Sequence, residues 1–270
     1  DVTFVYESFN KMFNTIKQAI DKSILIISRQ CHHHGHKVLV SGNNIYYEKH
    51  GTGHHHVLLL PGALGSTKTD FPDQIQGLNK DKFTLIAWDP PGYGQSRPPE
   101  RYFDNFYQKD VFHVGKLMEQ IGIDKYSVLG WSDGGITGMI LAAQRPQNVK
   151  KLVIWGSNSY VNNEDRRLVL SIRDTNKWSQ KARQGYEDVY GKEYFEQFWH
   201  RFVDEYVKIN DICKDDLANI QCPTFILNGD LDPMVAKEHC DYLAQRIKNV
   251  RLHRFPQGKH NIHQRYAQEF

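Results

Sequence analysis

The sequence predicts an α/β protein whose eight strands form a mostly parallel sheet, with a helical segment inserted before the last two strands. Short apolar runs recur along the chain, and from the third onward they alternate with longer helical patterns. Such alternation favours a parallel sheet covered by helices. The predicted strands are residues 37–40, 45–49, 57–60, 83–88, 126–129, 151–155, 224–228 and 250–255.

The first two strands are expected to form a hairpin across residues 41–44. Residues 158–219 contain no convincing strand and are rich in Trp, Tyr, Phe and charged residues. We interpret them as a helical cap over the carboxyl end of the sheet, where ligands bind in open α/β folds. The core is then divided into residues 37–157 and 220–270.

A nucleophile motif lies between the fifth strand and a helix predicted over residues 134–144. Gly130, Trp131, Ser132, Asp133 and Gly134 fit G-x-S-x-G. In α/β-hydrolases this pattern places the serine on a sharp strand-to-helix turn, with its Oγ held out at the top of the sheet. The alternative is a Gly-rich turn with an incidental serine.

The partners of a catalytic serine follow in the order expected for α/β-hydrolases, in which an acid and then a histidine come after the nucleophile. Asp232 lies in the turn after the seventh strand, and His260 lies in the loop after the eighth. The histidine would take the proton of Ser132, and the carboxylate would fix the histidine tautomer and stabilise the imidazolium. Ser132, Asp232 and His260 form the predicted triad.

Three other residues compete for these roles. Asp230 shares the turn with Asp232, but it is better explained as a turn-forming residue. His253 lies within the pattern of the last strand, and His263 is expected in the first turn of the last helix.

An oxyanion hole needs backbone N–H groups aimed at developing negative charge. One is expected from Asp133, the residue after the nucleophile. The second is expected from Leu64 in the Gly-rich loop after the third strand, with Ala63 as the neighbouring alternative. Gly62 and Ala63 are also predicted to border the substrate.

Four segments together carry a resemblance to a known family: Leu-Pro-Gly-Ala-Leu-Gly at 60–65, Trp-Asp-Pro-Pro-Gly-Tyr-Gly-Gln-Ser-Arg-Pro-Pro at 88–99, Gly-Trp-Ser-Asp-Gly-Gly-Ile-Thr at 130–137 and Gly-Lys-His-Asn at 258–261. They resemble the biphenyl hydrolase-like proteins, also called valacyclovir hydrolases, and the similarity runs from about residue 37 to residue 270. The resemblance implies a serine hydrolase for α-amino acid esters. It also implies that Asp133 binds the substrate ammonium.

The chemistry of Asp133 is compatible with that role, because a carboxylate beside a developing oxyanion needs a compensating cation. The alternative is a carboxylate that only complements the helix N-terminus. Two residues depart from the expected pattern. Pro91 stands where many hydrolases have Arg, and Ala63 stands where a larger apolar residue such as Met is expected.

Composition excludes several other classes of function. The net charge of +3 includes no basic block, so nothing indicates a nucleic-acid partner. The four cysteines show no paired spacing, and the histidine runs at 32–34 and 54–56 lack the ligand spacing of a zinc site. No apolar run reaches the roughly 18 residues of a spanning helix. We therefore expect a monomeric enzyme without metal or cofactor, acting on a small-molecule ester.

Residues 1–36 are treated as an extension outside the fold. The stretch from Met12 to Gln30 is amphipathic, basic and nearly free of acids, which is typical of transit peptides. It predicts a mitochondrial location with Met12 as the true start. The alternatives are an N-terminal helix or disordered tail, and a cytoplasmic location. At the other end, residues 264–270 look helical, and the final helix is expected to be truncated.

Two rival functions stay open at this point. One is a different hydrolase subtype, either a general carboxylesterase or a C–C bond hydrolase, which would share the sheet and the triad. The other is a catalytically silent binding protein of the same fold.

Overall fold

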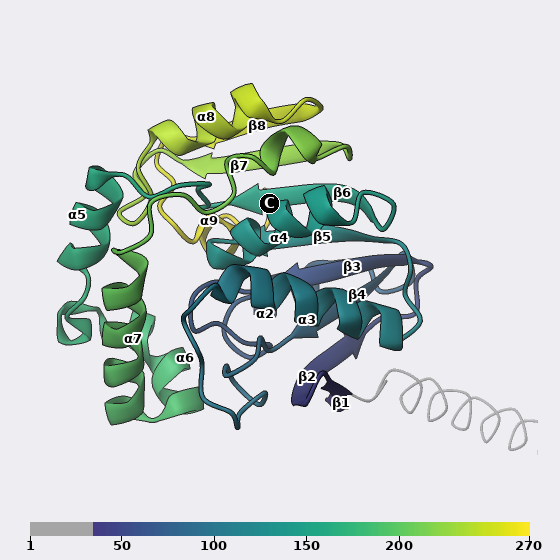
Figure 1. Ribbon diagram of the computed structural model, residues 1–270, viewed down its shortest axis with the longest axis horizontal. Coiled ribbons are helices and arrows are strands. Elements are labelled where there is room, and N and C mark those ends of the chain that lie inside the picture. Colours follow the sequence, from purple (N-terminus) through teal and green to yellow (C-terminus); the bar gives the residue numbers. More distant parts are fainter. Residues whose placement is uncertain (1–34) are drawn as a thin grey trace, which may run out of the picture. The chain divides into compact units, whose positions relative to one another are not determined.

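A computed structural model describes residues 35–270 and contains the predicted eight-stranded sheet (Figure 1). The predicted transit peptide lies outside the described residues. The strands run in the order β1-β2-β4-β3-β5-β6-β7-β8. Their bounds are β1 His36–Val40, β2 Asn43–His50, β3 His55–Leu60, β4 Phe83–Trp88, β5 Tyr126–Trp131, β6 Val149–Trp155, β7 Thr224–Gly229 and β8 Val250–Phe255.

The hairpin and the parallel pairing both agree with the sequence-based prediction. β1 pairs with β2 in antiparallel fashion, and β2 pairs in the same way with β4. Ser41 and Gly42, which join β1 to β2, both have positive φ angles, as two-residue hairpin turns of type I′ require. All the other neighbours in the sheet are parallel.

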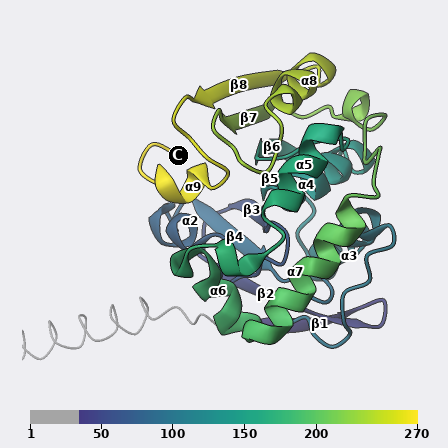
Figure 2. The same cartoon turned by 90° about the vertical axis from the view of Figure 1, so that its left-hand side faces the viewer.

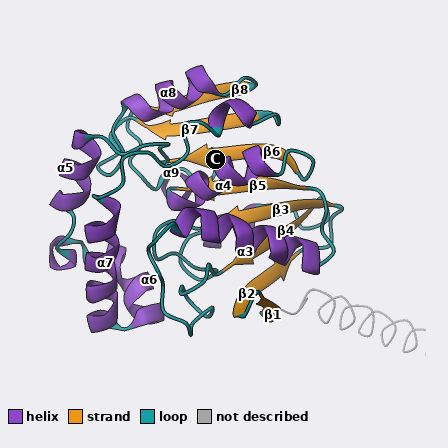
Figure 3. Cartoon of the chain, in the orientation of Figure 1, coloured by secondary structure: helices purple, strands orange, loops and turns teal. Residues whose placement is uncertain are grey.

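The sheet is buried on both faces, and the alternation of side chains along β3 shows why residues 57–60 are continuously apolar. Leu58 and Leu60 belong to one core cluster, whereas Val57 and Leu59 belong to the other. The first cluster includes residues of α3 (Phe106–Gln120), α4 (Asp133–Gln144) and α8 (Glu238–Arg246). The second includes residues on or beside α2 (Pro72–Gly77) and α9 (Ile262–Arg265). Helices therefore cover both sides of the strands (Figure 3).

The segment between β6 and β7 is helical, as predicted, and stands at the carboxyl ends of the strands (Figures 1 and 2). Its elements are α5 (Asn163–Ser171), η1 (Thr175–Lys177), α6 (Gln180–Tyr190), α7 (Lys192–Tyr206) and η2 (Leu217–Asn219). The two ends of this cap meet in a β-bridge between Tyr160 and Asp211. Most of its aromatic residues pack rather than line a site, because Phe195, Phe198 and Trp199 are all buried in the core.

The last helix is shorter and earlier than the sequence pattern indicates. α9 spans only Ile262–Arg265, and the chain then continues in turns, with the N–H groups of Glu269 and Phe270 both bonded to the carbonyl of Tyr266. The apolar pattern arises because Tyr266 and Phe270 pack on the core as turn residues.

Candidate active site

Ser132 occupies the turn between β5 and α4, with φ 55° and ψ −123°. This strained conformation is rare for a residue with a side chain and is found where function requires it. The flanking glycines make the turn possible. A Cβ on Gly134 would lie 2.0 Å from the carbonyl oxygen of Leu60, and one on Gly130 would lie 2.5 Å from that of Gly134.

Asp232 and His260 contact each other directly. His260 Nδ1 lies 2.8 Å from Asp232 Oδ2, and both side chains are buried. The other oxygen of Asp232 accepts hydrogen bonds from the N–H groups of Met234 and Val235, at 2.8 and 3.1 Å. These bonds fix the carboxylate, so that Oδ2 is held toward the imidazole.

The turn after β6 brings Ser132 and His260 to the same edge of the sheet. The Ser132 N–H donates to the carbonyl of Trp155 at 2.9 Å. Gly156 follows with φ 59°, and a Cβ there would lie 2.8 Å from His260 Cε1. Gly156 has no role in the sequence-based prediction, although a glycine at the carboxyl end of a parallel strand was a usable signal. The indole N–H of Trp131 also fixes the histidine loop by donating to the carbonyl of His260 at 3.0 Å.

The structure gives Asp230 a different environment from that of Asp232. Its Oδ1 accepts hydrogen bonds from Arg254 at 2.7 Å and from Asn228 at 3.0 Å. Although burial opposes the effect, the bond from Arg254 holds the pKa of Asp230 below its usual value. Asp230 therefore pairs with an arginine and not with His260.

The two competing histidines lie where the sequence placed them. His253 is part of β8, and His263 is in the first turn of α9. His263 accepts from the indole N–H of Trp155 at 2.9 Å and donates to the carbonyl of Asp70 at 2.9 Å. Burial lowers the pKa of His263 to about 3, so it is a neutral, structural histidine.

The loop after β3 approaches Ser132, the predicted nucleophile, as an oxyanion hole requires. Its turn is closed by a bond of 3.0 Å from the Gly65 N–H to the carbonyl of Gly62. A Cβ on Gly62 would lie 3.3 Å from Ser132 Cβ. Leu64 is buried and is the third residue of this four-residue turn. Its φ of 58° is the left-handed geometry that a type II turn requires at that position. Asp133 is the first residue of α4, so its N–H has no partner within the helix.

Two side chains that are absent from the predicted site, Asp70 and Tyr190, fix the position of this loop. The buried carboxylate of Asp70 accepts from the Gly62 N–H at 2.8 Å, and burial raises its pKa to about 7. The Tyr190 hydroxyl, on cap helix α6, donates to the carbonyl of Leu64 at 2.8 Å. The cap therefore helps to set the position of the predicted oxyanion donor.

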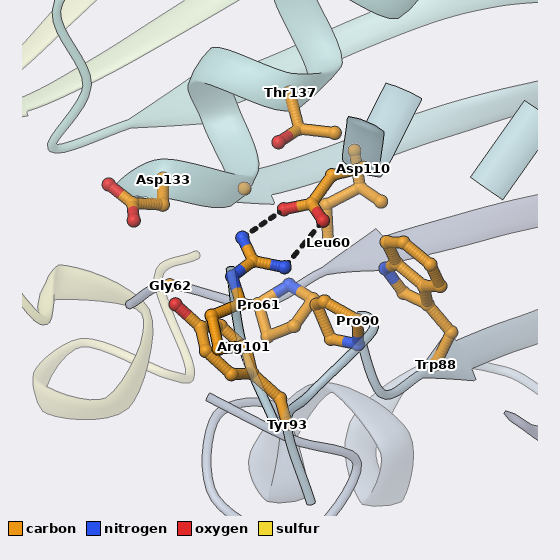
Figure 4. A pocket seen from close by; sticks show the side chains of 11 residues that line it. Leu60, Pro61, Gly62, Trp88, Pro90, Tyr93, Arg101, Asp110, Asp133 and Thr137 are labelled. Atoms are coloured by element: carbon orange, nitrogen blue, oxygen red, sulfur yellow. Dashed lines mark hydrogen bonds and ion pairs between the residues drawn. The ribbon is translucent and has the colours of Figure 1, made fainter. Parts of the chain in front are cut away.

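Asp133 is buried beside a small cavity and has one unused acceptor. The Tyr107 hydroxyl donates to Oδ1 at 2.9 Å. Oδ2 has no hydrogen-bond partner among residues 35–270. Burial raises the pKa of Asp133 to about 7, although Tyr107 and Arg101 oppose the shift. The residues that line the cavity are Leu60, Pro61, Gly62, Trp88, Pro90, Tyr93, Arg101, Asp110, Asp133, Gly134 and Thr137 (Figure 4).

A buried ion pair forms part of the same cavity. Arg101 donates to both oxygens of Asp110, each at 2.6 Å. Arg101 also donates to the carbonyl of Pro91 at 3.0 Å, so a guanidinium contacts the position where the loop lacks its expected arginine. Figure 4 shows the Asp133 carboxylate directed away from this pair. Asp110 neutralises Arg101 directly, and among residues 35–270 the Asp133 carboxylate forms no ion pair.

We expect Asp110→Asn to lower the free energy of unfolding by about 3–5 kcal/mol, because it leaves a buried guanidinium without its counter-charge. The side chains of Arg101 and Asp110 are only 3% and 7% exposed. Urea denaturation would measure the loss. Asp104→Asn is the matched control, because the pair of Asp104 with Lys109 is exposed to solvent and should contribute little. A loss no larger than that of the control would contradict the argument.

Within residues 35–270, no cluster of three or more His, Cys, Asp or Glu side chains is arranged to hold a metal ion. None of the helices described combines the length and apolarity needed to cross a bilayer. The cysteines at 213, 222 and 240 are free.

Comparison with known proteins assigns the class first. The α/β hydrolase fold family matches residues 55–185 and 165–264. Among solved structures, MGS-M2, an α/β hydrolase enzyme from a deep-sea metagenome library of the Medee basin, superposes with a TM-score of 0.73. It is 20% identical, and the match covers 87% of this chain and 94% of that one. The chain is therefore an α/β-hydrolase, as its sheet and nucleophile turn predict.

Sequence similarity then assigns the family. Serine hydrolase BPHL of Mus musculus is 48% identical over 240 residues, and that of Homo sapiens is 45% identical over the same length. Each match covers 87% of this chain and 82% of the relative. The chain belongs to the BPHL family of serine hydrolases, which confirms the resemblance found in the sequence.

Proposed function

We propose that this protein hydrolyses small carboxylic esters and prefers those of α-amino acids, with Ser132, His260 and Asp232 as its catalytic triad. The buried carboxylate of Asp133 carries the substrate assignment. It is next to the proposed nucleophile in the chain, its Oδ2 has no partner in the described part of the chain, and Asp110 already neutralises Arg101. A buried unpaired carboxylate is costly unless a cation binds to it. The ammonium of an α-amino ester supplies that cation.

The proposed reaction follows the usual course of a serine hydrolase. His260 takes the proton of Ser132 as Oγ attacks the ester carbonyl, and Asp232 stabilises the imidazolium through Nδ1. The N–H groups of Asp133 and Leu64 receive the developing oxyanion. The histidine then protonates the departing alcohol, which leaves an acyl-enzyme. Water activated by the same histidine releases the amino acid, and no cofactor is needed.

Asp133 can contact both the carbonyl oxygen and the ammonium of the substrate, because it offers a backbone N–H to the first and a carboxylate to the second. Its backbone faces the predicted oxyanion site, so its side chain lies near the acyl group. Gly62 and Ala63 would border the carbonyl from the opposite loop. Such a site would select esters whose ammonium is separated from the carbonyl by a single carbon.

If Asp133 binds the ammonium, Asp133→Ala should lower kcat/KM for an amino acid ester about 10- to 150-fold and largely spare the desamino analogue. A hydrogen bond to a charged group contributes about 1.5–3 kcal/mol, and each 1.4 kcal/mol corresponds to a factor of ten. The backbone N–H survives the substitution, so the oxyanion hole should persist. Kinetics on the ethyl esters of phenylalanine and of 3-phenylpropanoic acid would measure the difference.

Two results would count against this substrate. Equal losses on the two esters would mean that Asp133 acts structurally, at the turn or at the helix terminus. An unsubstituted enzyme without preference for the amino ester would be a general carboxylesterase. Adding a substrate with a cleavable C–C bond to the same panel would distinguish an esterase from a C–C bond hydrolase, the remaining alternative.

Two further properties complete the proposal. The basic, acid-poor stretch from Met12 to Gln30 supports a mitochondrial location. A site built entirely from one chain supports activity as a monomer, because the proposed triad, oxyanion loop and Asp133 all come from residues 62–260 of a single copy.

A further inference from the structure

The proposed mechanism gives no role to the buried hydroxyl of Tyr107, although this hydroxyl contacts Asp133. Tyr107 lies in the first turn of α3 and is 5% exposed. Its hydroxyl donates to Asp133 Oδ1 at 2.9 Å. The ring packs against that of Phe106, with 4.0 Å between the ring centroids, so the phenol has little freedom to move. Oδ1 is therefore held in place, whereas Oδ2 stays unbonded within the described residues.

We propose that Tyr107 is a specificity-determining positioning residue, whose hydroxyl orients the Asp133 carboxylate and keeps it ionised so that Oδ2 can bind the substrate ammonium. This inference rests on the proposed function, because it assigns Tyr107 a role only if Asp133 recognises the ammonium. A hydrogen bond from a neutral phenol stabilises the ionised carboxylate without supplying a positive charge. A cationic partner in its place would compete with the substrate.

The surroundings of Asp133 explain why such a donor is needed. The titratable and charged groups that interact with it are Tyr107 and Asp110 on α3, Tyr93 and Arg101 after β4, His260 after β8 and Tyr206 on α7. Burial raises the pKa of Asp133 to about 7, and the bond from Tyr107 is the largest of the influences that lower it. Burial and the charge of Asp133 raise the pKa of Tyr107 itself well above its usual value, so this hydroxyl stays protonated and always donates.

The sign of the pH effect follows from these contacts. Asp133 binds an ammonium only when it is ionised, so amino-ester preference should increase as the pH rises through the pKa of Asp133. Removing the Tyr107 hydroxyl should move that pKa upward. A bond of this type corresponds to a shift of about one unit or more. At pH 6, below both pKa values, a shift of one unit reduces the ionised fraction about tenfold.

The test is the ratio of kcat/KM for phenylalanine ethyl ester to that for 3-phenylpropanoic acid ethyl ester, measured from pH 5 to 9. Dividing by the desamino ester removes the ionisation of His260, which both substrates need. The ionisation of the substrate ammonium stays in the ratio, but it is the same for every enzyme variant and therefore does not affect their comparison. In Tyr107→Phe, the rising part of this ratio should move upward by about one pH unit, and the preference at pH 6 should fall about tenfold. Turnover of the desamino ester should change little.

Tyr126→Phe is the matched control. Tyr126 is also buried but begins β5, at the opposite end of the strand from Ser132, and its variant should keep the original profile. A Tyr107→Phe enzyme with an unmoved profile, or with equal losses on both esters, would overturn the inference. Asp133→Asn separates this failure from that of the proposed function. If Asp133→Asn abolishes the preference while Tyr107→Phe leaves it intact, only the role of Tyr107 is wrong. If the unsubstituted enzyme shows no preference, the proposed function fails, and the role of Tyr107 fails with it.

Discussion

Replacing Ser132 by alanine should lower kcat about 10⁴- to 10⁶-fold and leave the fold intact. Loss of the nucleophile removes the covalent pathway, and only the oxyanion hole and substrate binding then contribute. Ser132 has φ 55°, and alanine keeps the same Cβ, so the substitution should add no strain to the turn. Thermal unfolding should therefore shift little, which separates a chemical defect from a folding defect.

Covalent labelling tests the same assignment independently. An organophosphonate should modify Ser132 and no other serine, and peptide mass spectrometry would locate the adduct. Ser127→Ala is a suitable control, because Ser127 is another buried serine on β5 whose hydroxyl is bonded to His55. Near-normal ester turnover in the Ser132 variant, or an adduct on a different serine, would show that the nucleophile was misassigned.

The fold was predictable because local sequence and tertiary structure agree at each strand. The run from Val57 to Leu60 is apolar on both faces of a central parallel strand, and Pro and Gly follow it directly. The nucleophile turn is equally local, since its glycines and its serine are contiguous. In α/β-hydrolases the serine, the acid and the histidine follow one another in this order along the chain. This order predicted that Asp232 and His260 are neighbours, and the structure places their side chains 2.8 Å apart.

Contacts between distant segments could not be predicted in this way. Nothing in the sequence around Tyr107 distinguishes it from a core aromatic residue, and its bond to Asp133 depends on how α3 packs against α4. The pairing of Arg101 with Asp110 has the same origin, since it joins a loop to a helix. The last helix was overestimated because apolar turn residues such as Tyr266 mimic a helical pattern when they pack on a core.

Asp232→Asn should lower kcat about 10⁴-fold, whereas Asp230→Asn should change it only severalfold. Both substitutions remove one negative charge from the same turn and preserve side-chain shape. Only Asp232 contacts His260, so only its loss affects the imidazole. A comparable change in a related triad lowers kcat by that factor while the geometry stays intact.

The hydrogen bonds around Asp232 explain why an amide cannot replace this carboxylate. Oδ1 accepts from the N–H groups of Met234 and Val235, so the oxygen of an asparagine would be retained at that position. The amide nitrogen would then face His260 Nδ1 as a donor. Nδ1 would have to accept, and the imidazole proton would move to Nε2. A histidine protonated at Nε2 cannot take the proton of Ser132.

Asp230→Asn keeps an oxygen for Arg254 and loses only the ion pairs of Asp230 with Arg254 and Lys237, neither of which involves His260. Steady-state kinetics on one ester, with circular dichroism to confirm folding, would rank the two variants. The reverse ranking would move the acid of the triad to Asp230 without changing the class of reaction. Equal and small effects would instead mean that His260 works without a carboxylate partner, which its buried contact with Asp232 argues against.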